Sequence, residues 1–295
     1  MTSLETDQIV WAAQLASTFE ACADKPGNVT RSQSFSTSRF EDFLVSAFAI
    51  GPAVKLMSRS GVGETVLNAV RATRMLTGTN TNLGILLLVV PLAKAVSRNH
   101  PGGIRKGLSV VLNGLTAADT CNIYEAIRHA EPAGLGKVAA YDVRETELNI
   151  TLKEAMAHAR KRDSIAAEYV TDFDITFTLG YPTLNGLWKD GHRFSECVVH
   201  TFLRILSEIP DTLISRKNGP ATTRRICEIA KQVCELGQIG SDKSIKAIED
   251  LDAQLRGKDH KLNPGTTADL TAAAIFIFLT EGGMLAHLPE LLRRW

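Results

Sequence analysis

The sequence predicts an all-α protein in which roughly a dozen helices form a single domain over residues 1–295. Apolar residues recur with the period of a helix through most of the chain, as the stripe Ile245, Ile248, Leu251 and Leu255 illustrates. Clusters of Gly, Pro, Asn and Asp separate these periodic segments and mark turns between helices. No low-complexity linker and no internal repeat divides the 295 residues, a length that can bury one large core.

The individual helices follow from this periodicity. The first has Leu4, Ile9, Ala16 and Phe19 on one face and ends at a turn over residues 24–28. Further helices are predicted over residues 39–58, 63–76, 82–97, 102–113, 118–131, 151–171, 219–236 and 266–281. Another apolar stripe contains Val198, Phe202, Ile205 and Ile209. The run from Val170 to Phe177 alternates like a strand, and we interpret it as either helical or extended.

Composition and charge exclude several classes of protein. The chain has 33 Lys and Arg against 32 Asp and Glu, so a net charge of +1 gives no overall attraction to nucleic acid or to an anionic membrane. Hydrophobic residues make up 44% and charged residues 22%, which excludes a disordered or collagen-like chain. The longest apolar run, Ile85 to Ala93, is broken by Pro91 and is shorter than the roughly 20 residues that a bilayer requires. We therefore expect neither a nucleic-acid partner nor a membrane span.

The cysteines and the first residues predict a cytoplasmic protein. The five cysteines form no CxxC pair, and nothing in their spacing indicates zinc ligation or a disulfide framework. Residues 1–8 are polar and acidic, and no long apolar block follows them as it would in a signal peptide. The apolar helix faces can be buried within one chain or across a homodimer, so the sequence leaves the oligomeric state open.

Two polar, Gly-containing turns lead directly into predicted helices. Residues 77–81 precede the helix over 82–97, and residues 263–267 precede the helix over 266–281. A helix N-terminus presents unpaired backbone N–H groups and a positive dipole end, and anions such as phosphate bind there. The Thr and Asn residues of these turns also suit plain helix capping. Local pattern alone leaves both interpretations open.

Carboxylates and cations near turns are the other candidates for chemistry. Asp211 follows Pro210 and Asp269 follows a Pro-Gly turn, and such oxygen ligands suit Mg²⁺. Asp269 would also complement a helix dipole without any catalytic role. Lys25 and the pair Arg216-Lys217 would bind phosphate, or would be solvated surface residues. The chain contains no GxSxG, HExxH, Walker A or GxGxxG sequence, which argues against common hydrolases, zinc proteases, P-loop enzymes and Rossmann dehydrogenases.

Four of these segments together resemble the triphosphoribosyl-dephospho-CoA synthase family. They are Phe19–Val29, Thr77–Gly84, Pro210–Gly219 and Leu262–Leu270. They occur in the order in which the family has them and span most of the chain. The resemblance implies a mainly α-helical cytoplasmic enzyme that joins ATP and dephospho-CoA. In that reaction the 2′-hydroxyl of dephospho-CoA attacks C1′ of the ATP ribose, adenine leaves, and an α-glycosidic bond forms.

The resemblance also implies roles for particular residues. Asp211 and Asp269 are expected to act as the base or to hold Mg²⁺. Binding of the nucleotide substrates is expected to involve Lys25, Gly27, Asn28, Thr79, Asn80, Thr81, Arg216, Lys217, Asn263, Gly265 and Thr266.

The chain departs from the family at one of these segments. The family typically has Asn-Thr-His-Lys-Gly where this chain has Asn80-Thr81-Asn82-Leu83-Gly84, so a phosphate-binding cation is missing. The segment Arg162–Phe173 resembles a branch found in methanogens and methylotrophic bacteria, which make tetrahydromethanopterin with an α-linked ribose 5-phosphate. An alternative is therefore transfer of a phosphoribosyl group to a pterin precursor, and a further one is a nucleotide-binding protein without catalysis.

Overall fold

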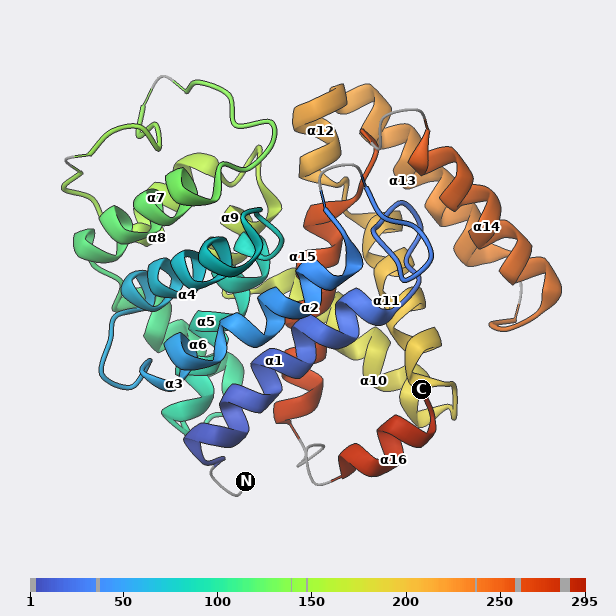
Figure 1. Cartoon of the computed structure of the whole chain (residues 1–295), viewed down its shortest axis with the longest axis horizontal. Coiled ribbons are helices and arrows are strands. Elements are labelled where there is room, and N and C mark those ends of the chain that lie inside the picture. Colours follow the sequence, from blue (N-terminus) through green and yellow to red (C-terminus); the bar gives the residue numbers. More distant parts are fainter. Residues whose placement is uncertain are drawn as a thin grey trace.

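The computed structural model describes residues 4–35, 38–138, 140–146, 148–236, 238–257, 261–281 and 287–295. Within these ranges every regular element is a helix (Figure 1), so the predicted all-α fold is confirmed. The helices are α1 (Thr6–Cys22), α2 (Phe40–Ala49), α3 (Gly51–Lys55), α4 (Val62–Thr77), α5 (Leu83–Ser97), α6 (Ile104–Asn113), α7 (Ala117–Ala130), α8 (Leu152–Ala159), α9 (Ser164–Val170), the π-helix η1 (Ile175–Gly180), α10 (Tyr181–Lys189), α11 (Phe194–Glu208), α12 (Thr212–Asn218), α13 (Pro220–Glu235), α14 (Asp242–Arg256), α15 (Gly265–Thr280) and α16 (Leu288–Arg293).

Two of the predicted helices are each divided into two. The segment 39–58 breaks at Ile50, where Pro52 begins a new helix, α3. The segment 151–171 breaks before Asp163, whose side chain accepts hydrogen bonds from the backbone N–H groups of Ile165 and Ala166 at 2.9 and 3.2 Å. Asp163 is thus the N-cap at which α9 begins as a separate helix. Local capping therefore shortens helices that apolar periodicity alone joins.

α15 is the central helix of the larger of two apolar clusters. It packs against α1, α5, α10 and α11, and its residues from Thr271 to Thr280 are all buried. α5 beside it is also apolar and buried along most of its length, as expected for a helix that is covered on nearly every side. No described helix is both long and apolar enough to cross a membrane.

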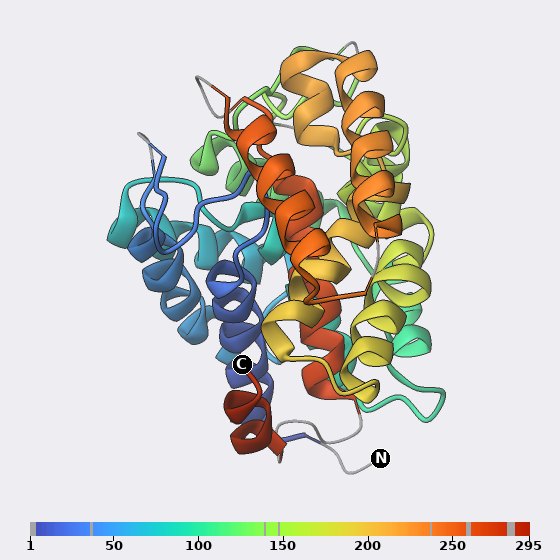
Figure 2. The ribbon, with the colours of Figure 1, turned by 90° about the vertical axis from the view of Figure 1, so that its right-hand side faces the viewer.

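A second apolar cluster holds α12, α13 and α14 against α11. Phe202 and Leu206 of α11 pack there with Ile226 of α13 and Leu251 of α14. Val199 contacts both clusters and links them. Figure 2 shows α14 lying alongside α13 on the face turned to the viewer. The C-terminal end of the chain, after α16, is held by Trp295, whose ring stacks on that of Phe19 in α1 with 5.2 Å between the ring centroids.

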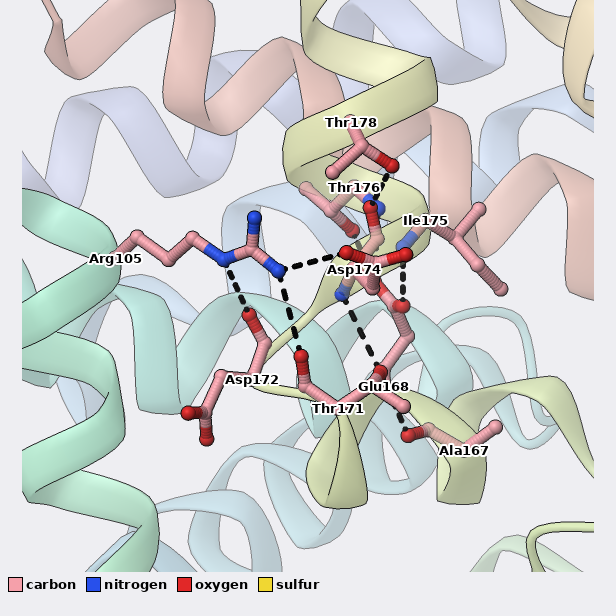
Figure 3. A network of polar contacts seen from close by, with 9 residues as sticks. All are labelled: Arg105, Ala167, Glu168, Thr171, Asp172, Asp174, Ile175, Thr176 and Thr178. Carbon is pink, nitrogen blue, oxygen red and sulfur yellow. Dashed lines mark hydrogen bonds and ion pairs between the residues drawn. The ribbon is translucent and has the colours of Figure 1, made fainter.

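A buried carboxylate determines the conformation of the segment that alternates like a strand. Glu168 is fully buried and accepts hydrogen bonds from the N–H groups of Ile175 and Thr176 at 2.8 and 3.0 Å, and from Thr176 Oγ1 at 2.6 Å (Figure 3). Asp172 and Phe173, at φ 52° and 58°, form the sharp turn that lets the chain fold back onto Glu168. The helical alternative is therefore confirmed, because Glu168 caps the start of η1.

The burial of the Glu168 carboxyl group predicts a pH dependence of stability. Burial raises the pKa of Glu168 to about 7 from an ordinary 4.5, although its hydrogen bonds oppose the shift. The folded protein therefore binds the proton more tightly than the unfolded chain does. The stability that results is complete below about pH 4.5 and is lost as the pH rises to 7. Relative to Glu168→Gln, the free energy of unfolding of the unmodified protein should fall by on the order of 3 kcal/mol between pH 4.5 and 7.

Urea unfolding of both proteins at several pH values measures this difference. The variant is the control for all other titrating groups, since only the Glu168 proton is removed from the comparison. Parallel pH profiles of the two proteins would contradict the prediction.

Candidate functional site

A cavity of about 730 Å³ lies where the first turns of α5 and α15 meet α7, α8, α9, α12 and residues 28–35 and 38–43. In Figure 1 the start of α15 lies between α7 and α8 on one side and the blue segment that follows α1 on the other. The volume is that of a typical small-molecule site, about 300–1,000 Å³. Segments from the whole length of the chain therefore contribute to one cavity.

Asp269 lies at the base of this cavity. A Cβ added to Gly84, the second residue of α5, would lie 2.0 Å from Asp269 Oδ2, so the carboxylate rests directly against the start of α5. The positive end of a helix dipole stabilises an anion there. No described residue forms a hydrogen bond or an ion pair with Asp269. Burial, and then the neighbouring carboxylates of Glu20, Asp211 and Asp163, raise the pKa of Asp269 well above its ordinary value.

Asp211, by contrast, is fully engaged within the protein. Its Oδ1 accepts from the N–H of Ile214 at 3.0 Å, and its Oδ2 accepts from the N–H and the hydroxyl of Thr267, both at 2.8 Å. The side chain is buried and does not line the cavity. Asp211 therefore caps α12 and ties it to the first turn of α15.

Lys25 is also buried away from the cavity. Its Nζ lies 3.0 Å from Glu20 Oε1 and donates to the carbonyl groups of Glu20 and Ala23. The lysine closes the turn after α1, and the Glu20 side chain, which does line the cavity, is held by this ion pair.

The same turn is held in place by α14. Asp252 Oδ1 accepts from the N–H of Gly27 at 2.8 Å, and Arg256 Nη2 donates to the Asn28 carbonyl at 2.7 Å. Asp252 Oδ2 and Arg256 Nε are 2.7 Å apart. Gly27 adopts φ 78°, and a Cβ there would lie 2.8 Å from Leu255 Cβ, so no other residue suits this position. α14 thereby fixes where Asn28 faces the cavity.

Cations gather on the side of the cavity formed by α12 and residues 132–138 and 141–143. Arg216 Nη1 lies 2.7 Å from Asp163 Oδ2, whereas no described residue forms an ion pair with its neighbour Lys217. Burial, and then the charge of Arg216, lower the pKa of Lys217. Lys137 and Arg162 also line this side. An anionic group of a ligand would relieve the repulsion between these cations.

Most of the residues predicted for the site meet at this cavity. Those that line it are Asn28, Asn80, Thr81, Arg216, Lys217, Asn263, Gly265, Thr266 and Asp269. The predicted residues that do not line it are Lys25, Gly27, Thr79 and Asp211. The prediction missed Glu20, Lys137 and Arg162, and it missed the contribution of α7 and α8. Glu20 carries a detectable signal, because a carboxylate that directly precedes the turn with Lys25 is a natural ion-pair partner.

The structure gives the predicted Mg²⁺ little support. In the part of the chain that the structure describes, no three His, Cys, Asp or Glu side chains are placed to hold a metal together. Both oxygens of Asp211 are already engaged, so the predicted pair of Asp211 and Asp269 does not suit metal ligation.

The chain matches a known protein family and resembles a solved structure. The family model described as CitG, ATP:dephospho-CoA triphosphoribosyl transferase, matches residues 6–286. Among solved structures, the chain is similar to a candidate triphosphoribosyl-dephospho-CoA synthase from Archaeoglobus fulgidus. The two are 29% identical with a TM-score of 0.63, and the similarity covers 81% of this chain and 99% of the other. A search of the proteins with curated functions finds no match.

The hold of α14 on the turn can be tested by stability. Arg256→Gln should lower the free energy of unfolding by about 1–3 kcal/mol, because it removes the buried guanidinium and leaves the partly buried Asp252 carboxylate without its cation. The matched control is Lys246→Gln, which removes the same kind of pair with Asp250 on the exposed face of α14 and should cost less than about 1 kcal/mol. Equal losses in the two variants, measured by urea unfolding, would show that the Arg256 pair does not hold the turn.

The contact between Gly84 and Asp269 predicts a coupling between substitutions. Gly84→Ala should destabilise the protein by about 1–3 kcal/mol, because the new methyl group must displace the carboxylate or the helix. Adding Asp269→Ala should recover most of that loss, because the obstructing carboxylate is gone. A double-mutant cycle on unfolding free energies measures the coupling, and additive effects would rule out the close approach.

Proposed function

The chain belongs to the ATP:dephospho-CoA triphosphoribosyl transferase family, whose members transfer ribosyl groups, and we propose that it joins ATP to dephospho-CoA with release of adenine. The observation that carries this proposal is the Asp269 carboxylate. It lies open to the cavity, next to the start of α5, and no described residue forms a hydrogen bond with it. A carboxylate kept in this state at a cost in stability is typical of a catalytic base.

The reaction forms one bond and breaks one. The 2′-oxygen of dephospho-CoA bonds to C1′ of the ATP ribose, and the bond from C1′ to the adenine nitrogen breaks with its electron pair leaving on adenine. Asp269 accepts the proton of the attacking hydroxyl. Conversion of the β-linked nucleotide to an α-linked product is a single inversion, so one base on the face opposite adenine suffices. The raised pKa makes Asp269 a stronger base than an exposed aspartate.

The cationic side of the cavity is the place for the triphosphate. Arg216, oriented by Asp163, and Lys217 would contact phosphate oxygens, with Lys137 on the facing segment. The first turn of α15 at Gly265 and Thr266 adds its dipole. The Asn28 and Asn80 side-chain amides would form hydrogen bonds with ribose hydroxyls. Asp211 and Lys25 act as positioning residues, because Asp211 ties α12 to α15 and Lys25 holds Glu20.

One observation favours a second candidate function. Leu83 is buried and lines the cavity where the family has a cation, and Asn82 is buried with its amide donating to Thr73 Oγ1 at 3.2 Å. With fewer positive charges at the start of α5, a donor with fewer phosphates at this point is better accommodated. Transfer of a phosphoribosyl group to a pterin precursor is the reaction of that kind.

The first function is tested by turnover. The protein is incubated with Mg²⁺, ATP and dephospho-CoA, and adenine and the mass of the CoA product are followed by chromatography and mass spectrometry. We expect equimolar adenine and product, and a decrease in kcat of about 10²–10⁴-fold for Asp269→Asn, which cannot accept the proton. Asp250→Asn, on the exposed face of α14, is the control and should keep full activity.

The pH profile adds an independent measurement. Because the pKa of Asp269 is raised, kcat/KM should fall with decreasing pH at a higher pH than the ordinary titration of an aspartate near 3.8 would give. Near-normal turnover by Asp269→Asn would overturn the assignment of the base. If the folded protein releases no adenine, the second candidate is tested with phosphoribosyl pyrophosphate and pterin precursors.

A further inference from the structure

One side of the cavity is formed by residues whose own side chains are uncharged, with the charges of Arg162 and Asp142 close to Tyr124. It is formed by Tyr124 and Ile127 of α7, Ala155, Met156 and Ala159 of α8, and Ile165 of α9, which we call the apolar wall. Tyr124, Ala155, Met156 and Ile165 are each less than 9% exposed. The Tyr124 hydroxyl is the one polar side-chain group among these six residues.

That hydroxyl is already used within the protein. Tyr124 donates to the carbonyl of Tyr141 at 2.8 Å, and burial raises the pKa of Tyr124 to about 12, so the group stays protonated. Tyr141 adopts φ 54°, and its ring lies 4.5 Å from that of His158 between centroids. The Tyr124 ring and the segment that follows α7 are thereby fixed against each other. The Tyr124 part of the apolar wall is therefore held in place, and the six side chains of the wall carry no charge of their own.

The apolar wall continues directly from the polar base of the cavity. The N–H of Ser164 donates to Thr212 Oγ1 at 3.3 Å, and Thr212 Oγ1 donates to Thr266 Oγ1 at 3.2 Å. These bonds join the start of α9 to the starts of α12 and α15. A ligand held at Thr266 and Asp269 would thus have its next group against Ile165 and α8.

We propose that the apolar wall binds the adenine base of a substrate nucleotide. The inference rests on the proposed function and adds the place of the base. Phosphates need cations and ribose hydroxyls need hydrogen-bond partners, and the apolar wall offers neither. An uncharged planar ring gains from contact with apolar and aromatic side chains through both its faces. Both ATP and dephospho-CoA carry such a ring, so the same chemistry has two sources.

Ligands that lack the adenine base provide the test. Binding of ATP and of ribose 5-triphosphate is measured by calorimetry without an acceptor, so that no turnover occurs. The variant Ala159→Phe fills the space beside the apolar wall with a neutral group. Its matched control is Ala157→Phe, the same change on the exposed side of α8. Ala159→Phe should weaken ATP binding by about tenfold or more and leave ribose 5-triphosphate within about twofold, whereas Ala157→Phe should change neither.

A second pair of ligands separates the two sources of adenine. Dephospho-CoA is compared with 4′-phosphopantetheine, which lacks the adenosine. Loss of ATP affinity alone assigns the apolar wall to the donor, and loss of dephospho-CoA affinity alone assigns it to the acceptor. The proposal is overturned if Ala159→Phe binds both complete nucleotides as the unmodified protein does, or if it weakens a complete ligand and its base-free counterpart equally.

These measurements separate failure of the adenine site from failure of the proposed transfer. Unchanged affinity for ribose 5-triphosphate shows that Ala159→Phe is folded with an intact phosphate site. If adenine is never released but the variant discriminates ATP from ribose 5-triphosphate, the proposed transfer fails and the base site stands. If transfer occurs and the variant does not discriminate, the base lies elsewhere.

Discussion

The buried carboxylate of Asp211 determines where α15 begins, and the cavity depends on that position. Its three hydrogen bonds fix the first turn of α12 and the N–H of Thr267 relative to each other. Thr212, next in sequence, then joins both helices to the start of α9. Since Asp269 lies half a turn further along α15, its approach to Gly84 follows from the same junction. A misplaced start of α15 would move Asp269, the cationic side of the cavity and the apolar wall apart.

Most of the described carboxylates around the cavity are paired within the protein, and one is not. Glu20 is paired with Lys25 and Asp163 with Arg216, and Asp211 is satisfied by N–H and hydroxyl donors. Burying an ionic group without a partner costs folding free energy, which explains why each of these carboxylates has a partner. Asp269 is the exception among the described acids of the cavity base. Its isolation stores free energy that binding of a hydroxyl or a positively charged sugar centre would release.

Sequence periodicity predicted the helices well because most of them have a single buried face, as Val198, Phe202 and Ile205 of α11 do. It could not predict the break before Asp163, since capping depends on one side chain rather than on a period. The resemblance to the family placed Lys25 and Asp211 at the site, but the sequence does not show which way their side chains point. Tyr124 and Met156 were missed as site residues because an apolar residue facing a cavity and one facing a core give the same pattern.

The hold of α14 on the turn after α1 also constrains the order of folding. Asn28 and Arg256 are separated by most of the chain, so their contact closes a very long loop. On a ribosome that adds about 5–20 residues per second, α14 emerges about 10–50 s after the turn it holds. Until then the turn is held by local contacts, such as those of Lys25 with Glu20 and Ala23, and the cavity is incomplete. The nascent chain thus lacks the complete cavity until its synthesis is nearly finished.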